Sequence, residues 1–89
     1  MNKEVTVEAC EEFIRSTFEK IAKACRCDIG KAGIEVGVFW DEAEKAGLWE
    51  RGTYGTPMSD ALSKLAKVEA RLNKEGKWSY SVFMMKKGE

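Results

Sequence analysis

The stretch Gly47-Leu48-Trp49-Glu50-Arg51-Gly52-Thr53-Tyr54-Gly55-Thr56-Pro57-Met58 separates two segments of helical composition. Gly47 stands where a helix would end, because Gly adopts the left-handed C-cap conformation and Leu48 can fold back onto the last turn. Thr56 and Pro57 stand where the next helix would begin. A Thr side chain accepts a hydrogen bond from the free amides of a first turn, and Pro in that turn loses no needed donor. The stretch therefore predicts a helix, a turn and a second helix.

The flanking segments have the three-to-four spacing of helices with one buried face. A first helix is predicted over residues 6–26, with Thr6 as its N-cap, and two further helices over residues 38–46 and 57–66. The predicted apolar positions are Cys10, Phe13, Ile14, Phe18, Ile21, Ala22 and Cys25 in the first helix, Val38, Phe39, Ala43 and Ala46 in the second, and Met58, Ala61, Leu62 and Leu65 in the third.

After the third predicted helix, apolar residues recur at every second position instead of every third or fourth. Residues 68–72 and 78–84 alternate apolar and polar side chains, and a polar turn containing Gly76 joins them, which predicts a β-hairpin. Residues 34–36 predict a short strand that needs a partner. The second hairpin run becomes apolar on both faces, so we expect it under the first helix or in the middle of three strands. Trp78 is expected in the core or as an anchor of the hairpin, and residues 86–89 as a tail.

Length and composition predict one soluble domain spanning residues 1–89. No apolar stretch approaches the roughly 20 residues that span a bilayer, and the N-terminus lacks a signal-peptide pattern. Three cysteines, an odd number, fit a reducing compartment, so we expect a cytoplasmic protein without a membrane partner. Residues 1–50 carry 7 Lys/Arg and 11 Asp/Glu, a net charge of −4, whereas residues 51–89 carry 8 and 4, a net charge of +4.

The element order, with Ala46-Gly47-Leu48 closing the second helix and Thr56-Pro57 opening the third, resembles the winged helix-turn-helix superfamily. The resemblance covers residues from about 7 to 85. It implies an α+β fold of three helices with a short strand and a C-terminal β-hairpin wing. Val38 to Leu65 also looks loosely like the HARE type of winged helix, found fused to chromatin, restriction and polymerase-associated proteins. These marks specify a fold better than a function.

The resemblance implies that the third helix lies in the major groove of double-stranded DNA and that the wing touches the backbone or minor groove. Hydroxyls and ammonium groups suit phosphate oxygens, which position a protein without reading sequence. The side chains so implied are Arg51, Thr53 and Tyr54 in the turn, Thr56, Ser59, Ser63, Lys64 and Lys67 on or beside the helix, and Arg71, Lys74 and Lys77 on the wing.

Two functions follow as hypotheses. The first is a small DNA-binding transcriptional regulator or mobile-element accessory protein, which would gain affinity as a homodimer through the first helix. The alternative is a winged-helix protein-interaction module, such as an adaptor or a phage-encoded inhibitor of a host nucleic-acid machine, that uses Trp40, Glu44 and Trp49. The third helix presents Asp60 and lacks the Arg, Asn and Gln side chains that read base edges, which favours the alternative.

Enzymatic activity, a metal and a cofactor are not expected. The chain has no His, and no Ser or Cys has an obvious base nearby in the sequence. Cys25-x-Cys27 with Cys10 does not have the spacing of a zinc site. Gly52-x-x-Gly55 lacks the Gly-Lys-Ser/Thr ending of a phosphate-binding loop.

Overall fold

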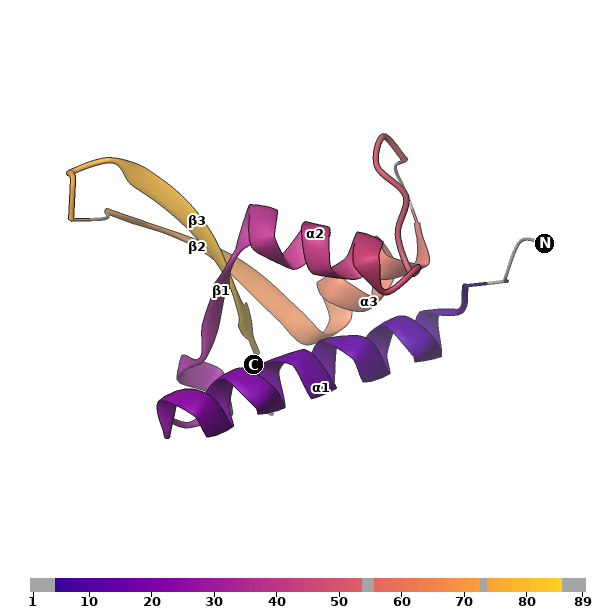
Figure 1. The fold of residues 1–89 in the computed structure, drawn as a ribbon, viewed down its shortest axis with the longest axis horizontal. Helices are drawn as coiled ribbons and strands as arrows, with labels where there is room; N and C mark the ends of the chain where they lie inside the picture. Colours follow the sequence, from indigo (N-terminus) through magenta and orange to yellow (C-terminus); the bar gives the residue numbers. More distant parts are fainter. Residues whose placement is uncertain (1–4, 54–55, 73, 86–89) are drawn as a thin grey trace.

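The computed structural model describes residues 5–53, 56–72 and 74–85. Its elements are the helices α1 (Val7–Cys25), α2 (Val36–Lys45) and α3 (Pro57–Leu65), a 3₁₀ turn η1 (Ile29–Lys31), and the strands β1 (Gly33–Glu35), β2 (Ala66–Leu72) and β3 (Trp78–Met84). Helix α1 runs along one side, α2 and α3 lie over it, and the β2–β3 hairpin projects away from the helices (Figure 1). This α+β order is compatible with a winged-helix layout.

Helix α1 begins as predicted. The backbone N–H of Ala9 donates to Thr6 Oγ1 at 3.1 Å, so Thr6 is the N-cap. Cys10, Ile14 and Phe18 form the buried centre of the predicted apolar stripe. The prediction is wrong at Cys25, whose side chain is exposed because the helix ends there and the chain turns away.

Helix α2 begins two residues earlier than predicted, and β1 correspondingly ends at Glu35. The reason is an N-cap that was not predicted: the Glu35 carboxylate accepts the backbone N–H of Gly37 at 3.1 Å. Of the predicted apolar face, Phe39 and Ala43 are buried, whereas Val38 and Ala46 are exposed. Helix α2 therefore buries a narrower face than its composition indicated.

The caps that frame the predicted turn are confirmed. Gly47 has a φ of 75°, and its N–H donates to the Glu44 carbonyl at 3.0 Å while the Leu48 N–H donates to the Ala43 carbonyl at 3.1 Å. These two bonds are the Schellman arrangement, which satisfies carbonyls at the end of α2. The N–H of Ser59 donates to Thr56 Oγ1 at 3.3 Å, which caps α3.

The sheet is antiparallel with the strand order β1–β3–β2, so β3 occupies the middle as one of the two alternatives predicted. The register pairs Val82 with Ile34 on one side and with Val68 on the other. Since paired residues share a face, these three side chains lie on the face that packs against the helices. Phe83 belongs to the opposite face.

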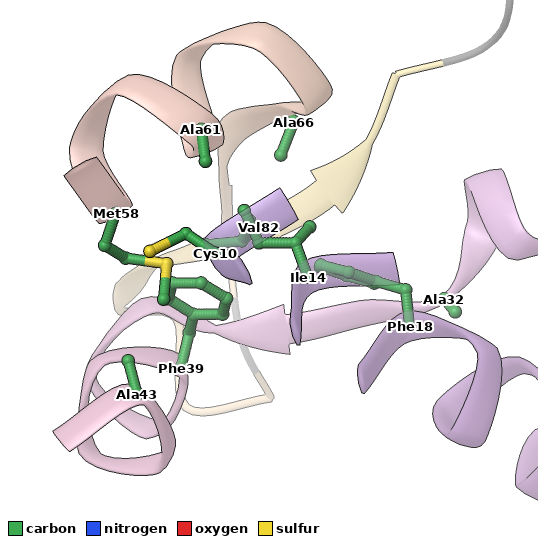
Figure 2. Close-up of a cluster of buried hydrophobic side chains, with 10 residues drawn as sticks. All are labelled: Cys10, Ile14, Phe18, Ala32, Phe39, Ala43, Met58, Ala61, Ala66 and Val82. Carbon is green, nitrogen blue, oxygen red and sulfur yellow. The ribbon is translucent and has the colours of Figure 1, made fainter. Parts of the chain in front are cut away.

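The core lies between α1, α3, the start of α2 and the middle of β3. Figure 2 shows Cys10, Phe39 and Met58 converging at one end of this cluster, with Val82 beside them and Phe18 at the other end. All five side chains are fully buried. Burial raises the pKa of the Cys10 thiol, because a thiolate would lose its hydration there.

Cys25 and Cys27 are joined by a disulfide just after α1. This is a local link across two positions rather than a bridge between elements.

Within the described ranges, no three His, Cys, Asp or Glu side chains gather as metal ligands would. None of the helices in those ranges has both the length and the apolar composition needed to cross a bilayer.

Candidate functional site

Trp40 and Trp49 pack against each other beside the core. Trp40 lies on α2, and Trp49 follows the cap that ends this helix. Their ring centroids are 4.8 Å apart with the planes at 47°. Trp40 also packs edge-to-face on the buried ring of Phe39, at 5.5 Å between centroids. Since both indoles are half-buried and rest on the core, they form a fixed aromatic surface rather than two mobile side chains.

This aromatic pair borders a hollow of about 600 Å³, which lies within the range of ligand-binding clefts. The hollow is lined by Gly37, Trp40, Asp41, Trp49, Arg51, Thr53 and Ser59. A second hollow of about 290 Å³ is lined by Trp40, Ser59, Leu62, Ser63, Ala66 and Val68. Because Trp40 and Ser59 belong to both linings, the hollows adjoin. We call the two together the Trp40 groove.

Arg51 lines the larger hollow of the Trp40 groove, together with Asp41 and Thr53. Its Nη2 lies 2.8 Å from Asp41 Oδ1 and 3.3 Å from Glu44 Oε1. The hydrogen bond to Asp41, followed by that to Glu44, raises the pKa of the Arg51 guanidinium. Glu44, which the sequence placed at a protein interface with the two tryptophans, thus reaches the rim of the groove through Arg51. The Arg51 side chain is 66% exposed, and exposed ion pairs of this kind add little stability.

The outer part of the hairpin, residues 69–72 and 74–80, extends beyond the helices, and we call it the arm (Figure 1). Leu72 pairs with Trp78 and Ala70 with Tyr80, on the same face as Val68 and Val82. This apolar face is exposed: Trp78 to 65%, Leu72 to 59% and Tyr80 to 56%. Of the two placements expected for Trp78, the core is therefore wrong, because the hairpin continues past the helices that would cover it, and the place on the hairpin remains.

The opposite face of the hairpin carries ion pairs. Glu69 lies between two cations, with its Oε1 3.4 Å from Lys67 Nζ and its Oε2 3.1 Å from Arg71 Nη2. The hydrogen bond from Arg71 is the largest influence, and the two cations together lower the pKa of Glu69. The guanidinium of Arg71 also lies 4.6 Å from the centroid of the Phe83 ring.

The side chains that the resemblance assigned to DNA do not form one free cationic face in the described structure. Arg51, Lys67 and Arg71 are paired with carboxylates. Several hydroxyls bond within the chain: Thr53 to the Glu50 carbonyl, Ser63 to the Ser59 carbonyl at 3.0 Å, and Thr56 to the amide of Ser59. Lys64, Lys74 and Lys77 are exposed, and Tyr54 lies outside the described residues.

The sequence analysis did not predict the second hollow, and it did not predict that the apolar face of the arm is exposed to solvent. Leu62 was predicted on the inward face of the third helix, and Val68 only as an apolar position of the hairpin. The length of the hairpin could have indicated that part of it is exposed. Its alternation of apolar and polar side chains continues to Leu72 and Trp78, whereas α2 and α3 are only 10 and 9 residues long. Short helices leave part of a longer hairpin uncovered.

No protein-family model matches the chain, and the searches of curated proteins and of solved structures gave no significant match. The functional interpretation therefore depends on the geometry of the surface.

Proposed function

We propose that this chain is a protein-interaction module of winged-helix layout that holds a segment of a partner protein in the Trp40 groove. The observation that carries the proposal is the position of Trp40, which lines both hollows, packs edge-to-face on Phe39 and lies tilted against Trp49. Tryptophan is enriched at protein interfaces and at the positions that dominate their binding energy. A module of this kind would act as an adaptor or as an inhibitor of the machine to which its partner belongs.

The two ends of the groove fit different parts of a partner segment. Leu62, Ala66 and Val68 make the smaller hollow apolar, so it would take an aliphatic or aromatic side chain. Asp41, Arg51 and Thr53 supply acceptors and donors in the larger hollow. The indoles, which rest on the core, lose little side-chain freedom on binding, which favours affinity.

Charge supports a protein partner over a nucleic acid. Binding to duplex DNA draws its affinity mainly from Lys and Arg side chains that neutralise phosphates. Here Arg51 is held by Asp41 and Glu44, and Glu69 holds two cations of the hairpin. The net charge of the whole chain is zero. Any phosphate contact by these side chains would compete with ion pairs already formed.

Duplex DNA is the second candidate, and one observation favours it. Lys64 lies in the last turn of α3, is exposed, and forms no ion pair within the described residues. When the binding constant for mixed-sequence duplex is measured at increasing salt, its logarithm should fall steeply with the logarithm of the salt concentration if several phosphates are contacted, and Lys64→Glu would lower that slope.

A homodimer through α1 would have to use the charged side of this helix, because Cys10, Ile14 and Phe18 are in the core.

The test of the protein-interaction proposal is site-specific photo-crosslinking in the cell of origin. A photo-reactive residue at Ser63, which lines the apolar hollow, should join the chain to one protein that remains bound after nuclease treatment. The matched control carries the same residue at Lys20, which is exposed on α1. Equal crosslinking from both positions, or crosslinks from Ser63 to nucleic acid alone, would contradict the proposal.

A further inference from the structure

The outer edge of β2 has no partner strand among the described residues. Strand β2 borders β3 only, and its seven residues pair with β3 in an unbroken register from Ala66–Met84 to Leu72–Trp78. This strand has neither a Pro nor a bulge, two of the devices that blunt an exposed edge, although it carries a third in the charged side chains Lys67, Glu69 and Arg71. Backbone groups along the outer edge of a sheet are a template for one further strand.

The side chains of β2 are self-complementary about Ala70. If a second β2 runs antiparallel to the first with the two Ala70 residues opposed, each Glu69 faces Arg71 of the second copy. Val68 then faces Leu72 of the second copy, which joins two exposed apolar side chains. Opposite charges and apolar side chains placed directly across a pair of strands both stabilise it.

Neighbouring registers are less favourable. With Glu69 at the centre, the two Glu69 carboxylates face each other and Lys67 faces Arg71 of the second copy, so like charges oppose. With Val68 at the centre, the ends of the two α3 helices approach, because α3 ends at Leu65 immediately before β2. Centring on Ala70 keeps the contact on the arm, which projects away from the helices (Figure 1).

We propose that two copies of this chain associate through their β2 edges, antiparallel about Ala70, to form one continuous six-stranded sheet. The zero net charge of the chain raises no overall repulsion between copies. The contact also brings Leu72 of the second copy beside Val68, at the apolar end of the Trp40 groove. This inference does not rest on the partner proposed for the groove, because it is argued from the edge and the side chains of β2; of the residues paired across the contact, Val68 also lines the smaller hollow.

The first test is sedimentation velocity of the chain from about 1 μM to about 1 mM, with dimerisation rising over this range. Glu69→Arg and Arg71→Glu should each weaken the dimer by about tenfold, since each places like charges in two symmetric pairs. An equimolar mixture of the two variants should restore it, because one copy then carries two cations where the other carries two carboxylates. Loss of the Glu69–Arg71 pair within a chain cannot be repaired by mixing.

The second test fixes the register. Opposed residues of antiparallel strands have Cα atoms about 4.5–5.5 Å apart, within the range that a disulfide spans. Ala70→Cys should therefore form a covalent dimer with itself on oxidation, whereas Val68→Cys should do so only when mixed with Leu72→Cys. Circular dichroism confirms that each variant is folded.

Three results would overturn the proposal: a monomer at every concentration, a dimer in which Ala70→Cys does not crosslink, or a mixture of the charge variants that remains monomeric. A monomer whose β2 edge pairs with a strand of another protein gives the first of these results. Crosslinking at Ser63 to a partner would be unaffected in all three cases, so the two proposals can fail separately.

Discussion

Gly33→Ala tests the register that places β1 on the central strand. A Cβ atom at Gly33 would lie 2.5 Å from Cε1 and 2.7 Å from Cζ of Phe83. Non-bonded carbon atoms normally approach to about 3.5–4.0 Å, so the ring would have to move by about 1 Å. Phe83 is only 6% exposed and lies against Arg71, which leaves the ring little room.

The expected cost is about 1–3 kcal/mol of unfolding free energy, which is typical of an overpacked site. For a domain of this size, each kcal/mol corresponds to a fall in Tm of about 4–8 °C. Urea unfolding followed by circular dichroism measures the change, with the m-value unaltered if only stability has changed. Phe83→Leu removes the obstructing ring atoms. The double variant should therefore lose less stability than the sum of the single ones, with a coupling of about 0.5–3 kcal/mol.

Gly37→Ala is the matched control. Its Cβ would approach only the Glu35 carboxylate, with Oε1 at 3.0 Å, so the largest expected cost is a weakened N-cap of α2. Ala is favoured over Gly by about 0.8–1.0 kcal/mol in a helix interior, and part of this gain applies at Gly37 in the first turn of α2. A neutral or stabilising Gly33→Ala, or strict additivity with Phe83→Leu, would refute the pairing of Gly33 with Phe83.

Three further predictions concern local features. Thr56→Ala should lower the unfolding free energy by about 1 kcal/mol in a urea titration, because the Ser59 amide loses its cap. Gly47→Ala should lower it by about 1–2 kcal/mol, since the φ of 75° disfavours a Cβ, and the loss should appear as a lower Tm. Acid should weaken the hairpin through Glu69. The pKa of its carboxyl is lower in the folded chain than the ordinary value of 4.5, so its contribution is present above that value and lost as pH falls through the folded pKa. Urea midpoints between pH 7 and 3 should then depend less on pH in Glu69→Gln than in the original chain.

Local chemistry predicted the elements well. Thr6, Gly47 and Thr56 mark helix ends through their own hydrogen bonds or backbone conformation, so their effect is visible within a few residues. The alternation in the hairpin likewise fixed which side chains share a face. The start of α2 was misplaced because Glu35 acts as its cap, and a Glu at that position is not among the preferred N-cap residues.

The candidate site was harder to predict because it depends on what covers each face. Periodicity grouped Leu72 and Trp78 correctly, but it cannot say that the helices end before reaching them. Arg51 pairs with Asp41, which lies ten positions earlier on the other side of the helix cap. The sequence shows the positive charge of Arg51 but not this partner. The resemblance assigned Arg51 to DNA, whereas the structure places it in an ion pair with Asp41.

Selection from a random peptide library displayed against the immobilised chain tests the proposed role of the Trp40 groove most directly. We predict enriched peptides that share a large apolar residue, and whose binding is lost in Ser63→Trp, where an indole would fill the apolar hollow. The same peptides should still bind Lys20→Trp, which adds an equal side chain to the exposed face of α1. No enrichment, or equal binding to both variants, would contradict a protein-binding groove at Trp40.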